Sequence, residues 1–162
     1  IVALRDGAVE WEWSSLVNPG APIPPSIQAL TGISNEMVAD APRFEDLARE
    51  VQERLDGRVF VAHNVRFDYG FVRAEMRRAG RDFAAPQLCT VRLSRHLYPD
   101  GGRHNLDSVM ARHGIGCEAR HRALPDARVL AQFWQRLLAE WTAVELQAAL
   151  DVVTRRPALP PQ

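Results

Sequence analysis

Hydrophobic and polar residues follow two different periods along this chain. Residues 9–17 alternate between apolar and polar side chains, and residues 1–5 before them are mostly apolar, with Asp6-Gly7 in between. This pattern predicts a β-hairpin whose turn contains Asp6 and Gly7. Residues 59–62 are wholly apolar, which is typical of an interior strand.

Elsewhere, apolar residues recur every three or four positions and predict helices. Ser34 and Gly80 are typical of the start and the end of a helix, respectively. Strands first, then helices interleaved with a central strand, favour a mixed α/β layer fold. The expected helices cover about 26–30, 35–38, 44–55, 68–79, 90–97, 106–112, 125–138 and 143–153.

The composition is that of an ordinary globular domain. Of the 162 residues, 46% are hydrophobic and 25% are charged, which is enough for one domain with a sizeable core. The 20 basic residues balance 20 acidic residues, so the chain has no overall positive charge that would attract nucleic acid. A locally basic cleft is compatible with this balance. Cys89 and Cys117 lack metal-type spacing, which favours a reduced, cytoplasmic protein. No apolar run is long enough to cross a membrane.

Both ends of the sequence suggest a longer polypeptide. The first residue is Ile1 rather than Met, and residues 1–4 resemble the body of a strand. Residues 157–162 are rich in proline, which is typical of a linker. We therefore expect an N-terminally truncated domain over residues 1–156, followed by a Pro-rich linker or tail over residues 157–162.

Two short polar motifs each place an aspartate at the start of a predicted helix. The motifs are His63-Asn64-Val65-Arg66-Phe67-Asp68 and His121-Arg122-Ala123-Leu124-Pro125-Asp126. Helical spacing puts Asp68 and Asp126 in line with apolar side chains, on the face that each helix should bury. Each aspartate taken alone is compatible with an ordinary helix cap. A divalent cation is the other interpretation, because a buried carboxylate needs a positive partner.

The two histidines of these motifs predict different roles. His63 follows the apolar run at 59–62, where a structural imidazole is expected. His121 lies in the polar stretch 118–122, so we expect an accessible ring that can deprotonate water beside a metal-binding carboxylate. We further expect Asp68 and Asp126 to converge at the carboxyl end of the strand 59–62, with His121 close by.

The motifs resemble those of the DEDDh 3′–5′ exonucleases, a family that includes the proofreading epsilon subunit of bacterial replicative DNA polymerase and its paralogues. Residues 63–68 resemble the second exonuclease motif, and residues 121–127 resemble the third. The segment Thr31-Gly32-Ile33-Ser34 resembles the loop before them, and residues 105–109 with Gly114-Ile115 resemble the helix between them. The likeness covers about residues 1–140 in the family's order.

This resemblance implies a ribonuclease H-like α/β fold, with a mixed sheet flanked by helices, and hydrolysis assisted by two metal ions. On the resemblance, Asp68 and Asp126 help to hold two Mg²⁺ or Mn²⁺ ions, and His121 activates the attacking water. The implied reaction releases nucleoside monophosphates from a DNA 3′ end, above all a single-stranded one, in proofreading or repair. The implied protein partner is a DNA polymerase subunit or a fused nuclease domain. The residues implied to lie near the terminal nucleotide are Asn64, Thr31, Gly32 and Ile33.

One motif of the family is absent from this sequence. The first motif, Asp-x-Glu, precedes in relatives the strand that begins here at Ile1, so we expect the first strand of the fold to be missing. Glu10 and Glu12 are poor substitutes, because they share the strand face opposite Trp11 and Trp13. Residues 1–162 alone should therefore bind metal weakly and hydrolyse DNA poorly. Two alternatives stay open: an exoribonuclease acting on RNA ends, and a non-catalytic module that binds nucleic acid or a partner.

Overall fold

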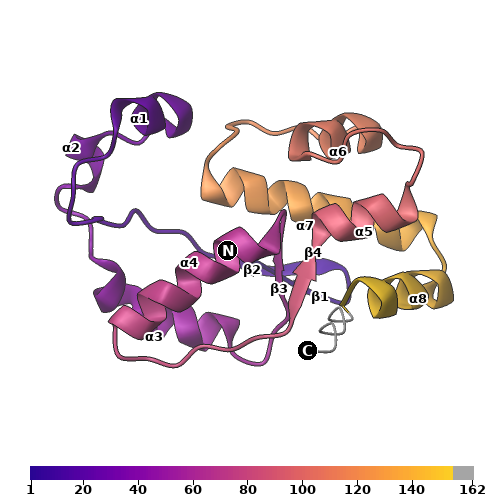
Figure 1. Ribbon diagram of the computed structural model, residues 1–162, viewed down its shortest axis with the longest axis horizontal. Coiled ribbons are helices and arrows are strands. Elements are labelled where there is room, and N and C mark those ends of the chain that lie inside the picture. The colour runs from indigo at the N-terminus through magenta and orange to yellow at the C-terminus, as the bar shows by residue number, and fades with distance from the viewer. Residues whose placement is uncertain (155–162) are drawn as a thin grey trace, which may run out of the picture.

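The computed structural model describes residues 1–154, which form short strands and longer helices (Figure 1). The predicted mixed α/β class is confirmed. In chain order the elements are β1 (Val2–Arg5), β2 (Ala8–Glu12), α1 (Pro25–Thr31), α2 (Asn35–Val38), α3 (Phe44–Leu55), β3 (Phe60–Ala62), α4 (Val65–Arg78), β4 (Gln87–Cys89), α5 (Thr90–Leu97), α6 (Leu106–His113), α7 (Ala123–Glu140) and α8 (Ala143–Thr154).

The strands form two separate pairs among the described residues. β1 and β2 are antiparallel, as the predicted hairpin requires, whereas β3 and β4 are parallel. A single mixed sheet was expected, but within residues 1–154 the two pairs are not hydrogen-bonded to each other. β3 is not the fully buried strand that its sequence suggested, because Val61 at its centre is 44% exposed. The apolar run reflects burial on one face of β3 only.

Two hydrophobic clusters hold the helices against the strands. The larger cluster joins α5, α6, α7 and α8 to β4, and its fully buried members include Leu93, Phe133 and Leu137. The smaller cluster joins α3 to α4 around Ala48 and Met76. The helices α3 to α8 therefore each bury one side, as their hydrophobic spacing predicted. None of the helices within residues 1–154 combines the length and the apolar character needed to cross a bilayer.

An extension made of residues 19–43, here called the arm, stands away from the main body (Figure 1). It contains α1 and α2, and α1 buries none of its residues. Asn18 holds the base of the arm: its backbone N–H donates to the carbonyl of Pro42 at 2.9 Å, and its side-chain amide donates to the carbonyl of Ala39 at 2.9 Å. The Thr31–Ile33 segment lies at the end of α1 and is therefore presented by the arm.

Gly7 makes the hairpin turn fit against α7. Its φ is +81°, and a Cβ at this position would lie 2.6 Å from Cδ1 of Leu138. We expect Gly7→Ala to lower the free energy of unfolding by about 1–2 kcal/mol, because the left-handed backbone is unfavourable for alanine. Urea unfolding followed by circular dichroism measures this change. Gly70→Ala is the matched control: Gly70 lies inside α4 with open space around it, so alanine should stabilise the protein there.

The sequence predicted most helices but not every strand. β4 was not predicted, and α4 begins at Val65 rather than near Asp68. The second hairpin strand ends at Glu12, whereas alternation continued to residue 17. The predicted linker at 157–162 lies outside the described residues.

Candidate active site

The motif at residues 63–68 lies where β3 ends and α4 begins. Ala62 at the end of β3 pairs with Cys89 at the end of β4, so α4 and α5 both start at the carboxyl edge of this parallel pair. Asn64 has a left-handed backbone with φ of 71°, which turns the chain directly from strand to helix. Asparagine adopts this conformation more readily than most residues. The tight turn leaves Asn64 exposed at the carboxyl edge, where open α/β sheets commonly bind ligands.

His63 occupies a structural position beside this turn. Its Nδ1 lies 2.9 Å from Oγ1 of Thr90, which in turn donates to the carbonyl of Ala62 at 3.3 Å. The Nε2 atom is buried and has no hydrogen-bond partner within residues 1–154. Burial lowers the pKa of His63, although the nearby carbonyl of His104 acts in the opposite direction. A neutral ring tied to Thr90 fits the structural role expected from the sequence.

Asp68 is exposed, which corrects the prediction that it lies on the buried face of its helix. The buried face of α4 centres on Val65 and Met76, and Asp68 lies to one side of it, because the eight residues from Asp68 to Met76 are not a whole number of helical turns. Protein atoms around the carboxyl group still displace water and raise the pKa of Asp68 above its ordinary value. Within residues 1–154 Asp68 forms no salt bridge.

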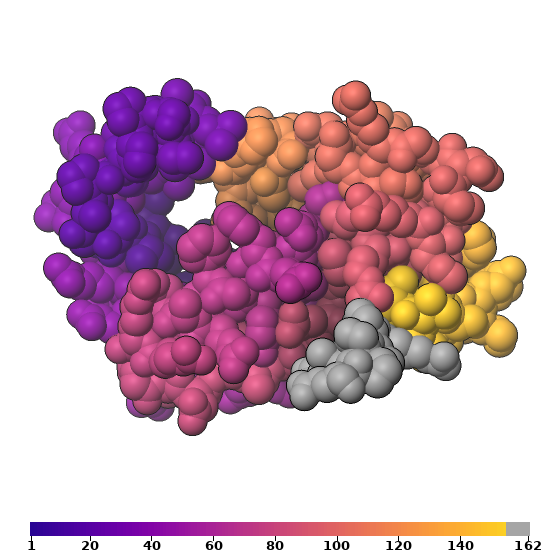
Figure 2. All heavy atoms as spheres, in the orientation of Figure 1, coloured from indigo at the N-terminus to yellow at the C-terminus, as the bar shows by residue number. Residues whose placement is uncertain are grey.

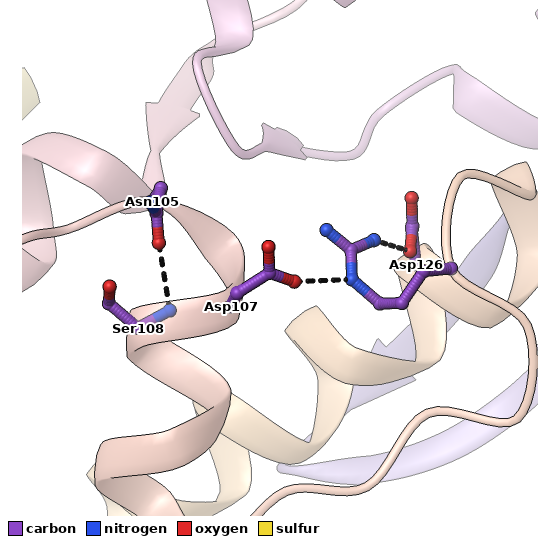
Figure 3. A network of polar contacts seen from close by, with 5 residues as sticks. Asn105, Asp107, Ser108 and Asp126 are labelled. Atoms are coloured by element: carbon purple, nitrogen blue, oxygen red, sulfur yellow. Dashed lines mark hydrogen bonds and ion pairs between the residues drawn. The ribbon is translucent and has the colours of Figure 1, made fainter. Parts of the chain in front are cut away.

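Asp126 is half-buried in the first turn of α7 and is bound by Arg120 (Figure 3). Nη1 of Arg120 donates to Oδ1 of Asp126, and Nε of the same guanidinium donates to Oδ1 of Asp107 at 2.8 Å. Arg120 thus bridges α6 and α7. Asn105 caps α6 by accepting a hydrogen bond from the N–H of Ser108 at 2.8 Å, which fixes the helix that carries Asp107. One of the two candidate metal-binding carboxylates is therefore already paired with a cation.

The charges in this bridge reinforce one another. Burial works to lower the pKa of Arg120, but the hydrogen bonds to Asp107 and Asp126 outweigh it and raise that pKa. The same guanidinium lowers the pKa of Asp107. The bridge is thus an ion pair at neutral pH, with one cation between two carboxylates.

His121 is exposed, as its polar surroundings predicted. Its backbone is left-handed, with φ of 66°, which is uncommon for a residue with a Cβ. Such a conformation costs on the order of 1–3 kcal/mol and persists where the surrounding structure enforces it. It turns the chain just before α7, so the imidazole and Asp126 are presented from the same end of one helix.

The arm contacts the motif at residues 121–126 through Arg122. Nη1 of Arg122 lies 3.5 Å from the carbonyl of Gly32, which ends α1 in a left-handed conformation. The hydroxyl of Thr31 accepts from the N–H of Ile33 at 3.2 Å, so this segment has a defined shape. Figure 2 shows an opening between the arm and the main body, closed at its upper side where α1 meets the region of α7. The Thr31–Ile33 segment and the His121 motif therefore lie at the same end of this opening.

The described residues do not make a complete metal site. No group of three or more His, Cys, Asp or Glu side chains within residues 1–154 is arranged to hold a metal ion. Asp68, Asp126 and His121 are therefore not brought together as three ready ligands, and Asp126 has a guanidinium as its cation. The carboxylate oxygens of Asp68 and Asp126 are the kind of ligand that Mg²⁺ or Mn²⁺ prefers, but two carboxylates are too few for a complete site. Their role as ligands stays a prediction.

Comparison with known proteins decides the family. Residues 1–133 match the RNase_T family model, which describes an exonuclease. The chain belongs to the exonuclease family. This exonuclease domain is 32% identical, over 140 residues, to DNA polymerase III subunit epsilon of Aquifex aeolicus, with 86% of this chain and 69% of that protein covered. The resemblance seen in the motifs is therefore confirmed.

Other relatives are much longer proteins. The domain is 39% identical to the 3′-5′ exonuclease DinG of Bacillus subtilis, with 85% of this chain but 15% of that protein covered. It is 36% identical to a putative bifunctional exonuclease/endonuclease of Mycobacterium tuberculosis, with 95% of this chain and 25% of that protein covered. The exonuclease domain thus spans a small part of several curated relatives that it matches.

A solved structure shows the same fold. Exonuclease X in complex with 5′ overhanging duplex DNA superposes with a TM-score of 0.70 and 28% identity, with 92% of this chain and 87% of that chain covered. The ribonuclease H-like fold expected from the motifs is therefore confirmed. The contacts of Arg120 and Arg122 were not predicted from the sequence. The one available signal was the cluster of three arginines and a histidine between residues 120 and 128.

Proposed function

We propose that this exonuclease domain hydrolyses phosphodiester bonds from the 3′ end of DNA and releases nucleoside monophosphates. The observation that carries this proposal is the start of α7, where an exposed His121 directly precedes the helix that presents Asp126. The names of the relatives, which include 3′-5′ exonuclease and DNA polymerase III subunits, support the same polarity and substrate. We propose a role in proofreading or repair in the cytoplasm, with a polymerase subunit or a fused nuclease domain as partner; the names of the relatives support the polymerase subunit and the fused nuclease.

We propose Asp68 and Asp126 as ligands of Mg²⁺ or Mn²⁺ in a two-metal site. Because residues 1–154 contain no complete ligand group, this site needs further carboxylates besides these two. When bound, the ions would neutralise the scissile phosphate and make a bound water more acidic. Asp68 is exposed and free of salt bridges within residues 1–154, so its carboxylate is available to such an ion.

His121 serves as the general base in this proposal. A ring nitrogen of His121 accepts a proton from the attacking water while the water oxygen bonds to phosphorus. The bond from phosphorus to the 3′ oxygen of the preceding nucleotide then breaks, and that oxygen leaves with the shortened strand and takes a proton from solvent to become its 3′ hydroxyl. The released nucleotide keeps the phosphate at its 5′ position. Because the ring is exposed, it can pass its proton to solvent before the next turnover.

The surroundings of the site favour a single strand. Phe67 and Phe71 on α4 are 64% and 58% exposed, and their ring centroids lie 4.7 Å apart on the helix that carries Asp68. Exposed aromatic rings suit stacking against unpaired bases. We propose that Asn64 and the Thr31–Ile33 segment contact the terminal nucleotide, and the Arg122 guanidinium beside Gly32 suits a phosphate.

The direct test uses the full-length gene product with single-stranded DNA. We expect mononucleotides from the labelled 3′ end in the presence of Mg²⁺, and none after chelation with EDTA. A strand blocked by a 3′ phosphorothioate linkage and an RNA strand of the same sequence serve as comparison substrates. Degradation from the 5′ end, internal cleavage, or hydrolysis of RNA alone would contradict the proposal.

One observation favours a second candidate, a non-catalytic module that binds nucleic acid. Asp126 is bound by Arg120, and residues 1–154 offer no three-donor metal site. A binding module would retain single-stranded DNA in the presence of EDTA and release no mononucleotide under any metal condition. The same assay therefore separates the two candidates.

A further inference from the structure

Arg120 binds Asp126, the carboxylate that the proposed function assigns to a metal ion. The side chains of Arg120 and Asp126 are 24% and 29% exposed, so their contact is largely shielded from water. The side chain of Asp107 is 71% exposed and binds the opposite edge of the guanidinium, at Nε. The three groups come from two helices and the turn between them (Figure 3).

We propose that Arg120 competes with a divalent cation for Asp126, and that Asp107 retains the guanidinium when the cation binds. The inference rests on the proposed function in that Asp126 takes a metal ion. A guanidinium and a divalent cation are both positive and repel each other at such short range, so each weakens the binding of the other to the same carboxylate. Because separate nitrogens of Arg120 bind the two carboxylates, the side chain can leave Asp126 and keep its contact with Asp107.

The backbone around Arg120 permits this exchange. Residues 114–122 form turns and irregular structure between α6 and α7, so the side chain can move without unwinding either helix. A bridge that only stabilised the fold would behave differently. Its loss would weaken the protein and leave the metal affinity unchanged or lower, whereas loss of a competitor raises the metal affinity.

The test measures binding of Mn²⁺ alone to the full-length protein, by electron paramagnetic resonance of the free ion. The site of interest is the one that disappears in Asp126→Asn. We expect Arg120→Gln to tighten Mn²⁺ binding at this site about tenfold, which corresponds to one charge-assisted hydrogen bond. We expect Asp107→Asn to weaken Mn²⁺ binding about threefold, because the second acceptor of the guanidinium is then uncharged and Arg120 leaves Asp126 less readily.

Two neighbouring residues provide matched controls for charge. Arg128→Gln removes an exposed positive charge two residues after Asp126 that pairs with Glu12 instead, and Glu118→Gln removes an exposed negative charge from the turn that carries Arg120. Both should change the Mn²⁺ affinity by less than about twofold, because exposed charges are screened by salt. Circular dichroism melting in EDTA checks that each variant is folded. If Arg120→Gln does not fold, the opposite-sign effect of Asp107→Asn still tests the exchange.

The inference is overturned if Arg120→Gln leaves Mn²⁺ affinity unchanged or lowers it, if Arg128→Gln raises it equally, or if no Asp126-dependent site exists in any variant. Its failure is distinct from failure of the proposed function. Release of mononucleotides without an effect of Arg120 on Mn²⁺ binding contradicts the competition alone. The expected Mn²⁺ affinities without mononucleotide release contradict the exonuclease proposal and leave the competition in place.

Discussion

Replacing His121 with alanine in the full-length protein should lower kcat for release of nucleotides from a DNA 3′ end by about 10²–10⁴-fold, the usual range for loss of a general base. The exposed ring at the start of α7 is proposed to take the proton of the attacking water, and alanine cannot. Affinity for DNA should change little, since the ring is not assigned to substrate binding. Single-turnover kinetics with 3′-labelled single-stranded DNA, and filter binding in EDTA, measure the two quantities separately.

The matched control for this prediction is His96→Ala. His96 is also exposed, but it lies on α5 and forms no side-chain hydrogen bond within residues 1–154. Its removal should leave kcat within about twofold of the parent. A His121→Ala variant that retains most of the rate would show that another group accepts the proton.

The helices of this domain were predictable because their signals are local. Ser34 caps α2 by accepting from the N–H of Met37 at 3.2 Å, and Gly114 ends α6 in a left-handed conformation. Hydrophobic spacing of three and four residues identified α3, α5 and α7. The motifs identified the family because their residues, their order and their spacing can all be read directly from a single sequence.

The strands and the site were less predictable because they depend on distant partners. β4 has three residues, too few for a periodic pattern, and it forms only because β3 lies beside it. Asp68 was expected on the buried face of α4, but that face depends on what packs against the helix, and here α3 packs on the side of Met76. The pairing of Arg120 with Asp126 depends on the path of an irregular turn. No sequence period describes such a turn.

Replacing Phe133 with alanine should lower the free energy of unfolding by about 3–5 kcal/mol, a large part of the total stability of a domain this size. Phe133 is 1% exposed in the larger hydrophobic cluster, and its ring centroid lies 5.0 Å from that of the buried His113 of α6. Alanine would leave a cavity between α6 and α7, which the rigid helices can close only in part. Urea unfolding followed by circular dichroism gives the change directly.

This prediction links the core to the proposed chemistry, because α6 and α7 carry the two carboxylates that Arg120 bridges. If packing at Phe133 fixes the spacing of these helices, the variant should lose activity at temperatures well below its melting temperature. Leu138→Ala is the control on the same helix: Leu138 is 44% exposed, so its truncation should cost about 1 kcal/mol or less. Equal losses for the two variants would mean that the contact between α6 and α7 is not tightly packed. In that case the position of Asp126 would depend on the turn around Arg120 rather than on the core.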